Sequence, residues 1–440
     1  MDRIEEKIVQ IIDSKRDEII EFARDIYDHA ELGYKEFRTA EKFTDKVKAI
    51  SERTEEGLAI TGVKAYINEE KKSNYSLALL GELDALRIPS HSHANKETDG
   101  AHCCGHHAQL TGVVGAALAL TDPEIKAALD GQVIFFAVPA EEYGEVEFKN
   151  KLKEQGKIKY GGGKCELIRI GAFDDVDSAV AHHIGPAIEL GSGSNNGFVS
   201  KVITIKGRAA HAAARPENGI NALSAASLGL SALAYNRETF RDQDSVRVHP
   251  ILTKGGDLVN VVPEEAVIET LVRGASLESF ADAAKKTDRS FKAGALALGA
   301  GIKIETMPGY LPALAQEYPA EIAEVVKELT DKPVIIKDPN FHSGGSTDVG
   351  DVQHLLPVYT FKTGGMTGGT HQTDFDIIDE DEAYVLTAKI FAVSAYRLLK
   401  DGAALAKKLK GEYEPRFKSK EEYTAFMDRF DGIEEIEIPK

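Results

Sequence analysis

Five short segments of the sequence carry residue types that bind metal ions or transfer protons in enzymes. The densest is 100–107, Gly-Ala-His-Cys-Cys-Gly-His-His, where three histidines and two cysteines stand within six positions. Thiolate and imidazole are strong ligands for zinc and similar divalent ions. Gly105 lets the backbone bend so that Cys104 and His106 can face the same ion. This segment therefore predicts a metal site.

The remaining segments place carboxylates and imidazoles at the ends of apolar runs or in a flexible loop. They contain the carboxylates Glu82, Asp84, Glu141 and Glu142 and the histidines His182, His183 and His371. Adjacent side chains at a strand end point in different directions, so one glutamate of a pair can bind metal while its neighbour acts as general base. Together the segments supply more ligands than one tetrahedral ion needs. This surplus favours a two-ion site that polarises a carbonyl group and deprotonates water.

The elements that must position these ligands are strands alternating with helices. Short apolar runs predict buried strands, and apolar residues at helical spacing predict helices. The strands are expected over 75–83, 131–138 and 177–184, and the helices over 3–24, 35–50 and from 107 onward. This alternation predicts an α/β domain with a mostly parallel central sheet and with its site at the carboxyl ends of the strands.

The pattern changes at the polar, glycine-rich run 191–197. Beyond it we expect the order β-α-β-β-α-β of a ferredoxin-like domain. Its strands are predicted over 199–207, 258–262, 265–274 and 301–306, and its helices over 219–236 and 277–298. The predicted organisation is a catalytic domain of residues 1–192 and 309–440, interrupted by an inserted domain at 193–308. The charged extension after Leu399 is expected to be peripheral.

Composition limits the class of protein. Hydrophobic residues make up 42% and charged residues 28% of the 440 residues, values typical of globular proteins. The net charge of -18 disfavours nucleic acid and anionic membranes as partners. No apolar run approaches the roughly 20 residues that span a bilayer, and the charged N-terminus lacks a signal-peptide core, so we expect a cytoplasmic protein. The three cysteines suit free thiols or ligands better than a disulfide framework.

The motifs occur in an order that resembles a known family. The runs ELDAL, CGHH, PAEE, VAHHIGP and GGTHQTDFD are similar to those of the cocatalytic-metal amidohydrolases and peptidases related to aminoacylase. The resemblance covers about residues 26–399 and is strongest to the branch with a cysteine ligand, which contains auxin-conjugate, hippurate and aminobenzoyl-glutamate hydrolases. The runs AELGYKEFRTAE and KGRAAHAAARPENGINAL resemble the same branch.

This resemblance implies a zinc-peptidase-like catalytic domain and a role for each candidate residue. Two divalent ions per subunit, zinc or manganese with nickel or cobalt as alternatives, would be bound by Cys104, His106, Glu142, His183 and His371. Glu141 would be the general base, and Asp84 would orient a ligand. In the inserted domain, which serves this family as lid and dimerisation domain, His211 would stabilise the oxyanion and Asn260 and Arg273 would hold the substrate carboxylate. Gly345 would face the substrate through its backbone.

Two departures from the branch affect the site. The branch usually has Asp where Glu82 stands, and Asp or Asn where His107 stands. His107 or Cys103 could add to the ligands or replace one. His182 competes with its neighbour His183, which we favour because two residues separate His183 from the following proline, as in the family.

The expected function is metal-dependent hydrolysis of the amide bond of N-acyl or N-aroyl amino acids by a homodimer. One alternative is a di- or aminopeptidase of the same family, which must recognise a free amino group. Another is a non-catalytic metal-binding protein on the same fold. Retention of Glu141 beside Glu142 argues against the last alternative, since metal storage needs no free base.

Overall fold

The computed structural model describes residues 1–438, which form two compact units. Unit 1 consists of Met1–Ser194, Leu314–Phe341 and Asp351–Lys420. Unit 2 consists of Asn195–Ala313, His342–Gly350 and the described residues from Glu421 onward. Residues 342–350 and 421–438, which we expected in the catalytic domain, thus belong to unit 2.

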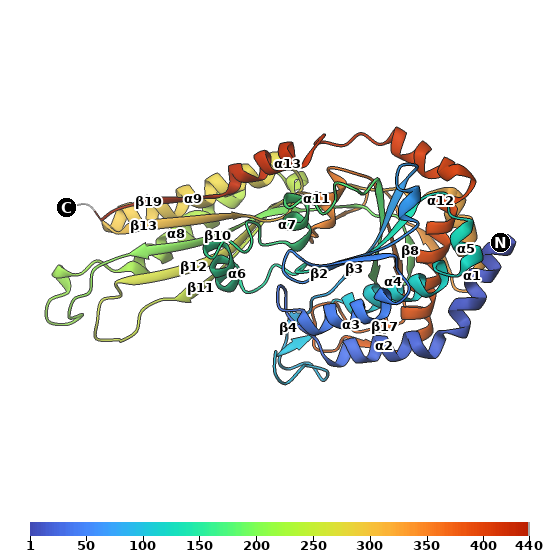
Figure 1. The fold of residues 1–440 in the computed structure, drawn as a ribbon. Coiled ribbons are helices and arrows are strands. Elements are labelled where there is room, and N and C mark those ends of the chain that lie inside the picture. The colour runs from blue at the N-terminus through green and yellow to red at the C-terminus, as the bar shows by residue number, and fades with distance from the viewer. Residues whose placement is uncertain (439–440) are drawn as a thin grey trace. The chain divides into compact units, whose positions relative to one another are not determined.

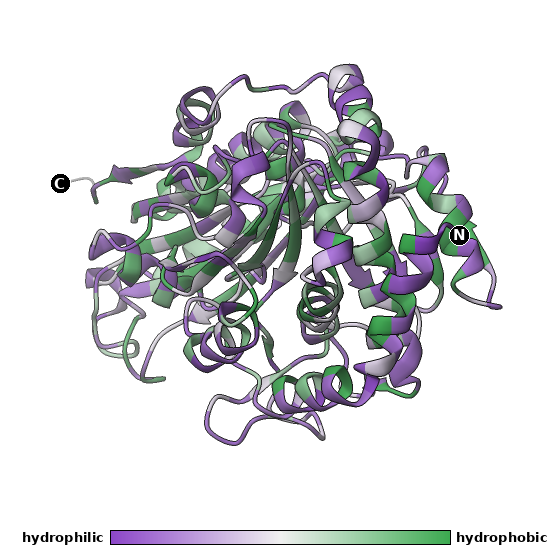
Figure 2. Ribbon diagram, turned by 45° about the vertical axis from the view of Figure 1, so that its right-hand side comes forward, coloured by the Kyte–Doolittle hydropathy of each residue, from purple (hydrophilic) through white to green (hydrophobic). Residues whose placement is uncertain are grey.

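Unit 1 contains an eight-stranded mixed sheet whose four central strands run parallel (Figure 1). These four strands are apolar and largely buried, as expected for a parallel sheet that is covered on both faces. Figure 2 shows the hydrophobic character of the central strands. In sheet order the strands are β1 (Arg53–Leu58), β2 (Gly62–Ile67), β6 (Gln132–Val138), β3 (Ser76–Glu82), β7 (Ser178–Ile184), β16 (Val358–Thr363), β8 (Ile188–Leu190) and β14 (Val334–Ile336).

Helices cover this sheet. The helix α4 (His106–Leu120) is apolar or small at every position from Leu110 onward, and all its residues except Leu118 are buried. It packs against β3, β7 and the long helix α12 (Thr387–Glu412), so it is a core helix rather than an amphipathic surface helix. The other helices of unit 1 include α1 (Arg3–Ser14), α2 (Arg16–Asp28), α3 (Phe37–Lys48), α5 (Pro123–Ala127), α6 (Val146–Glu154), α7 (Gly163–Arg169) and α10 (Ala320–Glu328).

Two helical predictions need correction. The single helix expected over 3–24 is two helices, α1 and α2, which break at Lys15, and the apolar spacing continues across this break. The charged extension expected to be peripheral after Leu399 begins as helix, because α12 continues to Glu412 through a non-helical stretch at Lys400–Ala403. Within residues 1–438, no helix is both long and apolar enough to cross a membrane.

Unit 2 contains a five-stranded antiparallel sheet, and α8 (Ala222–Asn236) and α9 (Leu277–Leu298) pack together on it (Figure 1). The strand order is β11 (Arg247–Lys254), β12 (Glu265–Gly274), β10 (Gly197–Lys206), β13 (Gly301–Pro308) and β19 (Gly432–Ile436). Along the chain the first six elements follow the order β10, α8, β11, β12, α9, β13. Buried and half-buried residues alternate along β12, as expected for a sheet with one covered face.

Two predictions for this unit were wrong. Residues 258–262 were expected to form a strand, but Leu258 and Val259 are exposed in a turn and β11 lies earlier in the chain. Pro250 obscured β11 in the sequence, because proline is tolerated only on edge strands such as this one. The C-terminal extension is not peripheral, since β19 pairs with β13 and completes the other edge of the sheet.

Candidate metal centre

The predicted ligands of unit 1 meet at the carboxyl ends of its parallel strands. His183 lies at the end of β7, the two glutamates follow β6, and Cys104 and His106 stand at the start of α4. Their donor atoms form two groups that share Cys104, and within each group all atoms lie within 4.8 Å of one another. One group is Cys104, His106 and His183, and the other is Cys104, Glu142 and His371.

The distances within these groups suit donor atoms that face a common cation. Sγ of Cys104 lies 3.3 Å from Nε2 of His183 and 3.3 Å from Nε2 of His371. Nε2 of His371 lies 3.1 Å from Oε1 of Glu142. Within residues 1–438, Nε2 of His106 and Oε1 of Glu142 are buried without a hydrogen-bond partner. Buried polar atoms are normally satisfied, and sulfur, nitrogen and oxygen donors together suit a transition metal, so the residues fit divalent cations.

The turn between Cys104 and His106 depends on glycine. Gly105 has a φ of 84° and caps the N-terminus of α4. A Cβ at this position would lie 2.2 Å from Cγ2 of Ile184. Glycine therefore allows both the left-handed conformation and the close approach of the ligand loop to the end of β7.

The two glutamates are separated from β6 by a left-handed residue. Ala140 has a φ of 48°, and its amide donates a 2.8 Å hydrogen bond to Oε1 of the buried Glu36. Glu142 is a member of the second ligand group, whereas Oε2 of Glu141 lies 3.9 Å from Nε2 of His106. Both carboxylates thus lie at the centre, as the pair of adjacent glutamates predicted.

Asp84 connects two of the candidate ligands. Nδ1 of His106 lies 2.9 Å from the backbone oxygen of Asp84 and 3.1 Å from its Oδ1. Oδ2 of Asp84 accepts a 2.8 Å hydrogen bond from the amide of Glu142. Burial opposes ionisation of Asp84, but these hydrogen bonds and the neighbouring imidazole lower its pKa to about 2. A carboxylate that orients a metal-binding histidine in this way is a common support of metal sites.

The centre favours added positive charge. Burial, reinforced by Glu142, raises the pKa of Cys104 well above its ordinary value, so the thiolate needs a cation beside it. Burial alone would lower the pKa of His106, but Glu82 and Cys104 outweigh it and raise that pKa well above normal. Both shifts show an excess of negative donors that divalent ions would neutralise.

Three neighbours of the ligands have other partners. Nε2 of His107 lies 3.1 Å from the hydroxyl of Tyr384, which belongs to the π-helical turn η5 (Asp381–Leu386). Nε2 of His182 lies 2.8 Å from Oγ1 of Thr363. The Cys103 thiol donates to the backbone oxygen of Ala101 at 3.5 Å. Within the described chain none of the three belongs to a group of metal-ligand atoms, so the alternatives left open by the sequence are not supported.

His371 is held by its backbone rather than by the aspartates that follow it. It has a φ of 64°, and its amide donates to the backbone oxygen of Cys103 at 2.8 Å. Asp374 accepts instead from the amide of Gly369, and Asp376 accepts from the hydroxyl of Tyr27.

The four predicted substrate residues lie in unit 2 and form two local groups. His211 forms an isolated antiparallel β-bridge with Val261, the residue after Asn260. The side chains of His211 and Asn260 are both exposed. Nδ1 of His211 accepts from two amides of the alanine-rich turn, at 3.3 and 3.2 Å, as a capping residue does. Nη1 of Arg273 donates a 2.6 Å hydrogen bond to Oγ of Ser346, next to Gly345. The catalytic and binding roles of these residues stay predictions.

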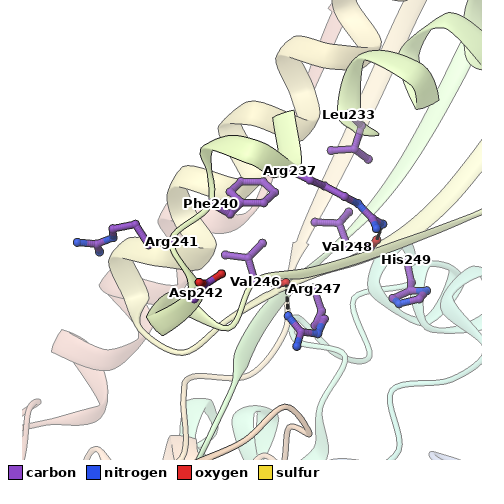
Figure 3. A pocket seen from close by; sticks show the side chains of 9 residues that line it. All are labelled: Leu233, Arg237, Phe240, Arg241, Asp242, Val246, Arg247, Val248 and His249. Atoms are coloured by element: carbon purple, nitrogen blue, oxygen red, sulfur yellow. Dashed lines mark hydrogen bonds between the residues drawn. The ribbon is translucent and has the colours of Figure 1, made fainter. Parts of the chain in front are cut away.

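A pocket of about 580 Å³ at the start of β11, also in unit 2, has a different character (Figure 3). Its lining contains Arg237, Arg241 and Arg247 but only one carboxylate and one histidine. The guanidinium groups of Arg237 and Arg247 donate to the backbone oxygens of Val248 and Val246. This lining lacks the ligand types of a metal centre, so the pocket is not the site of the chemistry.

Sequence reasoning missed two residues that support the centre. Lys164 is fully buried, and its Nζ lies 2.6 Å from Oε1 of Glu82. Oε1 of Gln109 accepts a 2.6 Å hydrogen bond from the amide of Glu82, and its amide group donates to the backbone oxygen of His182. The only available signal for Lys164 was a lysine directly after the run of glycines at 161–163.

Comparison with known proteins identifies the family of this centre. Residues 78–396 match the model of peptidase family M20/M25/M40. The chain belongs to this family. The match confirms the family resemblance that the motifs indicated.

Its relatives include both peptidases and amidohydrolases. The chain is 30% identical to the Xaa-Arg dipeptidase of Mus musculus over 58% of its own length and 56% of the relative's. It is 28% identical to a p-aminobenzoyl-glutamate hydrolase polypeptide of Escherichia coli (strain K12), over 70% of its own length and 60% of the relative's. The chain thus spans less than two thirds of the length of these relatives.

The fold is shared with solved structures of the family. The Bacillus subtilis YXEP protein, a dinuclear metal binding peptidase from the M20 family, matches with a TM-score of 0.62 and 22% identity. The match covers 88% of this chain and 99% of that protein. This likeness confirms the mixed α/β fold with its large, mostly parallel sheet.

The glycine between the two N-terminal ligands of α4 provides a first test. We expect Gly105→Ala to lower the free energy of unfolding by about 2 kcal/mol or more, because it adds both backbone strain and a steric clash. We also expect weaker metal binding. Urea unfolding and metal titration measure the two effects. Gly144→Ala is the matched control, since a Cβ at Gly144 meets no atom within 4 Å. Equal stability of the two variants would contradict this account of the loop.

Proposed function

We propose that this M20 protein uses two metal ions to hydrolyse the amide bond of N-acyl or N-aroyl amino acids. The observation that carries the proposal is the sharing of Cys104 by two groups of ligand atoms, with Glu141 beside them. The first group would bind one ion through His106 and His183, and the second would bind the other through Glu142 and His371. A centre of this kind suits the attack of water on a carbonyl group.

The ions, when bound, supply Lewis acidity that polarises the carbonyl group of the substrate and acidifies water. Glu141 is the base that accepts the proton of the attacking water and then delivers a proton to the leaving amine. Asp84 keeps the Nε2 atom of His106 available by hydrogen bonding to the other ring nitrogen. The mixed donor set suits zinc or manganese, with nickel and cobalt as alternatives.

A dipeptidase is the second candidate function, and the 30% identity to an Xaa-Arg dipeptidase supports it. Both reactions cleave an amide bond next to an amino acid that carries a free carboxylate. They differ at the other end of the substrate. A dipeptidase must bind a charged amino group, whereas an amidohydrolase accepts a neutral acyl or aroyl group.

We further propose that unit 2 is a ferredoxin-like lid domain through which the protein forms a homodimer. The free edge of its sheet is β11, because β19 covers the opposite edge. Large apolar side chains are exposed on or near this edge. They are Leu228 and Tyr235 on α8, Ile251 and Leu252 on β11, and Leu258 and Val259 in the following turn. An unpaired strand with an apolar neighbourhood is a natural surface for pairing with a second copy.

The role of Glu141 leads to a kinetic prediction. We expect Glu141→Gln to keep its bound metal but to lose about 10²- to 10⁴-fold in kcat, since the amide cannot act as a base. Metal analysis and steady-state hydrolysis of p-aminobenzoyl-glutamate, hippurate and N-acetyl amino acids measure both properties. Glu147→Gln changes an exposed glutamate nearby and is the control. Full activity after removal of all metal by a chelator would rule out the proposed reaction.

The substrate class is tested by pairs of compounds that differ only at the amino terminus. We expect N-acyl and N-aroyl amino acids to have a higher kcat/KM than dipeptides with the same C-terminal residue, because a neutral acyl group needs no carboxylate partner in the site. Dipeptides ending in arginine belong in the panel. A preference for the free dipeptides over their N-acetylated forms would favour the dipeptidase instead.

The dimer is tested in solution. We expect a mass of two chains by light scattering, and we expect Ile251→Lys to shift the protein toward the monomer by placing a charge on the free edge. Ile336→Lys is the matched control, because Ile336 is also exposed on an edge strand but belongs to unit 1. A wild-type protein that is monomeric at all concentrations would disprove this assembly.

A further inference from the structure

A buried lysine stands behind the metal centre of unit 1. The Lys164 side chain is 0% exposed, and its ammonium lies 2.6 Å from Oε1 of Glu82, whose side chain is 4% exposed. Burying two charges costs several kcal/mol each unless they are paired with good geometry. The second carboxylate oxygen of Glu82, Oε2, points to the centre and lies 3.2 Å from Nε2 of His106.

The surrounding backbone fixes this lysine and this glutamate in place. Helix α7 begins at Gly163, whose amide donates to the backbone oxygen of Ala140 at 3.0 Å. A Cβ on Gly163 would lie 1.7 Å from the backbone oxygen of Pro139, so only glycine lets the helix approach the end of β6 this closely. The amide of Glu82 is bound by Oε1 of Gln109. Glu82 is therefore held at its backbone amide by Gln109 and at its carboxylate by Lys164.

The imidazole ring of His106 is oriented so that its Nε2 atom and the Glu82 carboxylate face the same point. Nδ1 of His106 faces a backbone carbonyl oxygen, which can only accept, so Nδ1 carries a proton and donates. When a metal ion displaces the proton of Nε2, that atom presents its lone pair toward the centre. Oε2 of Glu82 presents lone pairs at the same place, 3.2 Å away. Two electron-pair donors at this separation repel each other unless a proton or a metal ion lies between or beside them, and a metal ion bound by both would take the place of that proton.

We propose that Glu82 is a further ligand of the ion that His106 binds, and that Lys164 positions it. Lys164 pairs with Oε1 of Glu82, so that Oε2 faces the ion. The glutamate side chain is one methylene longer than the aspartate usual in the related branch, which gives its carboxylate the reach to approach Nε2 of His106. This inference rests on the metal centre of the proposed function.

Metal titration of the wild-type protein and of two variants tests this ligand. Starting from metal-free protein, we expect wild type to bind two Zn²⁺ ions. We expect Glu82→Asp and Glu82→Gln to bind one of these ions about 10- to 100-fold more weakly. Near-UV circular dichroism checks folding. If Glu82→Gln does not fold, Glu82→Asp alone tests the proposed ligand, because aspartate keeps the negative charge and only shortens the side chain by one methylene.

Controls separate coordination from the general effect of disturbing a buried charge. Glu5→Gln removes a glutamate that is also buried and paired with an arginine, away from the centre, and should bind both ions as wild type does. We expect Lys164→Met to weaken the same ion as the Glu82 variants, whereas Lys64→Met, which removes another buried lysine paired with Asp175, should not.

A spectroscopic readout reports the coordination itself. We expect the Co²⁺-loaded Glu82→Asp protein to differ from wild type in its visible absorption bands, since loss of an oxygen ligand changes the coordination number. Wild-type affinity for both ions in the Glu82 variants, with unchanged Co²⁺ spectra, would overturn this inference and leave the proposed function standing. A wild-type protein that binds no Zn²⁺ would instead reject the centre as a whole.

Discussion

The metal centre of this protein depends on the burial of several electron-pair donors close to one another in unit 1. Cys104 faces two imidazoles, and buried atoms of His106 and Glu142 have no hydrogen-bond partner in the described chain. Such an arrangement is unfavourable in an apolar interior unless positive charge is added. Divalent ions would supply that charge, and the same ions would make the site reactive toward an amide.

The fold of unit 1 brings these donors together at one edge of its sheet. Parallel strands buried on both faces end at one edge of the sheet, so ligands distant in sequence arrive together. Where regular structure would point a side chain away, the backbone adopts left-handed conformations, at Gly105, Ala140 and His371. Strain of this kind persists only where the surrounding structure over-determines it, and it clusters at functional sites. Asp84 then links the ligand loop to the glutamate pair.

Much of this arrangement was predictable from the sequence because its signals are local. Apolar runs predicted three of the four central strands to within a residue or two, and the ligand types stand directly at their ends. The choice between His182 and His183 came from the spacing to Pro186 that the resembling family shows, and the structure places His183 beside Cys104. In unit 2 the same periodicity indicated β10, β12, β13 and both helices, but it placed the second strand at 258–262 instead of 247–254.

Other features depend on contacts that no local pattern encodes. The β11 strand contains Pro250 and has few buried residues, so only its pairing with β12 reveals it. The C-terminal residues look like a charged tail, yet β19 pairs with β13 across more than a hundred residues of sequence. The partnership of Lys164 with Glu82 likewise joins distant segments, and a lysine beside glycines reads as a surface loop until the packing is known.

The most direct test of the central claim is X-ray absorption at the metal edge of the fully loaded protein. Two ions that share the thiolate of Cys104 predict a sulfur scatterer at about 2.3 Å for zinc, and its loss in Cys104→Ser. A first shell of nitrogen and oxygen alone in the wild-type protein would contradict the account, because the donor that joins the two ligand groups would then bind no metal.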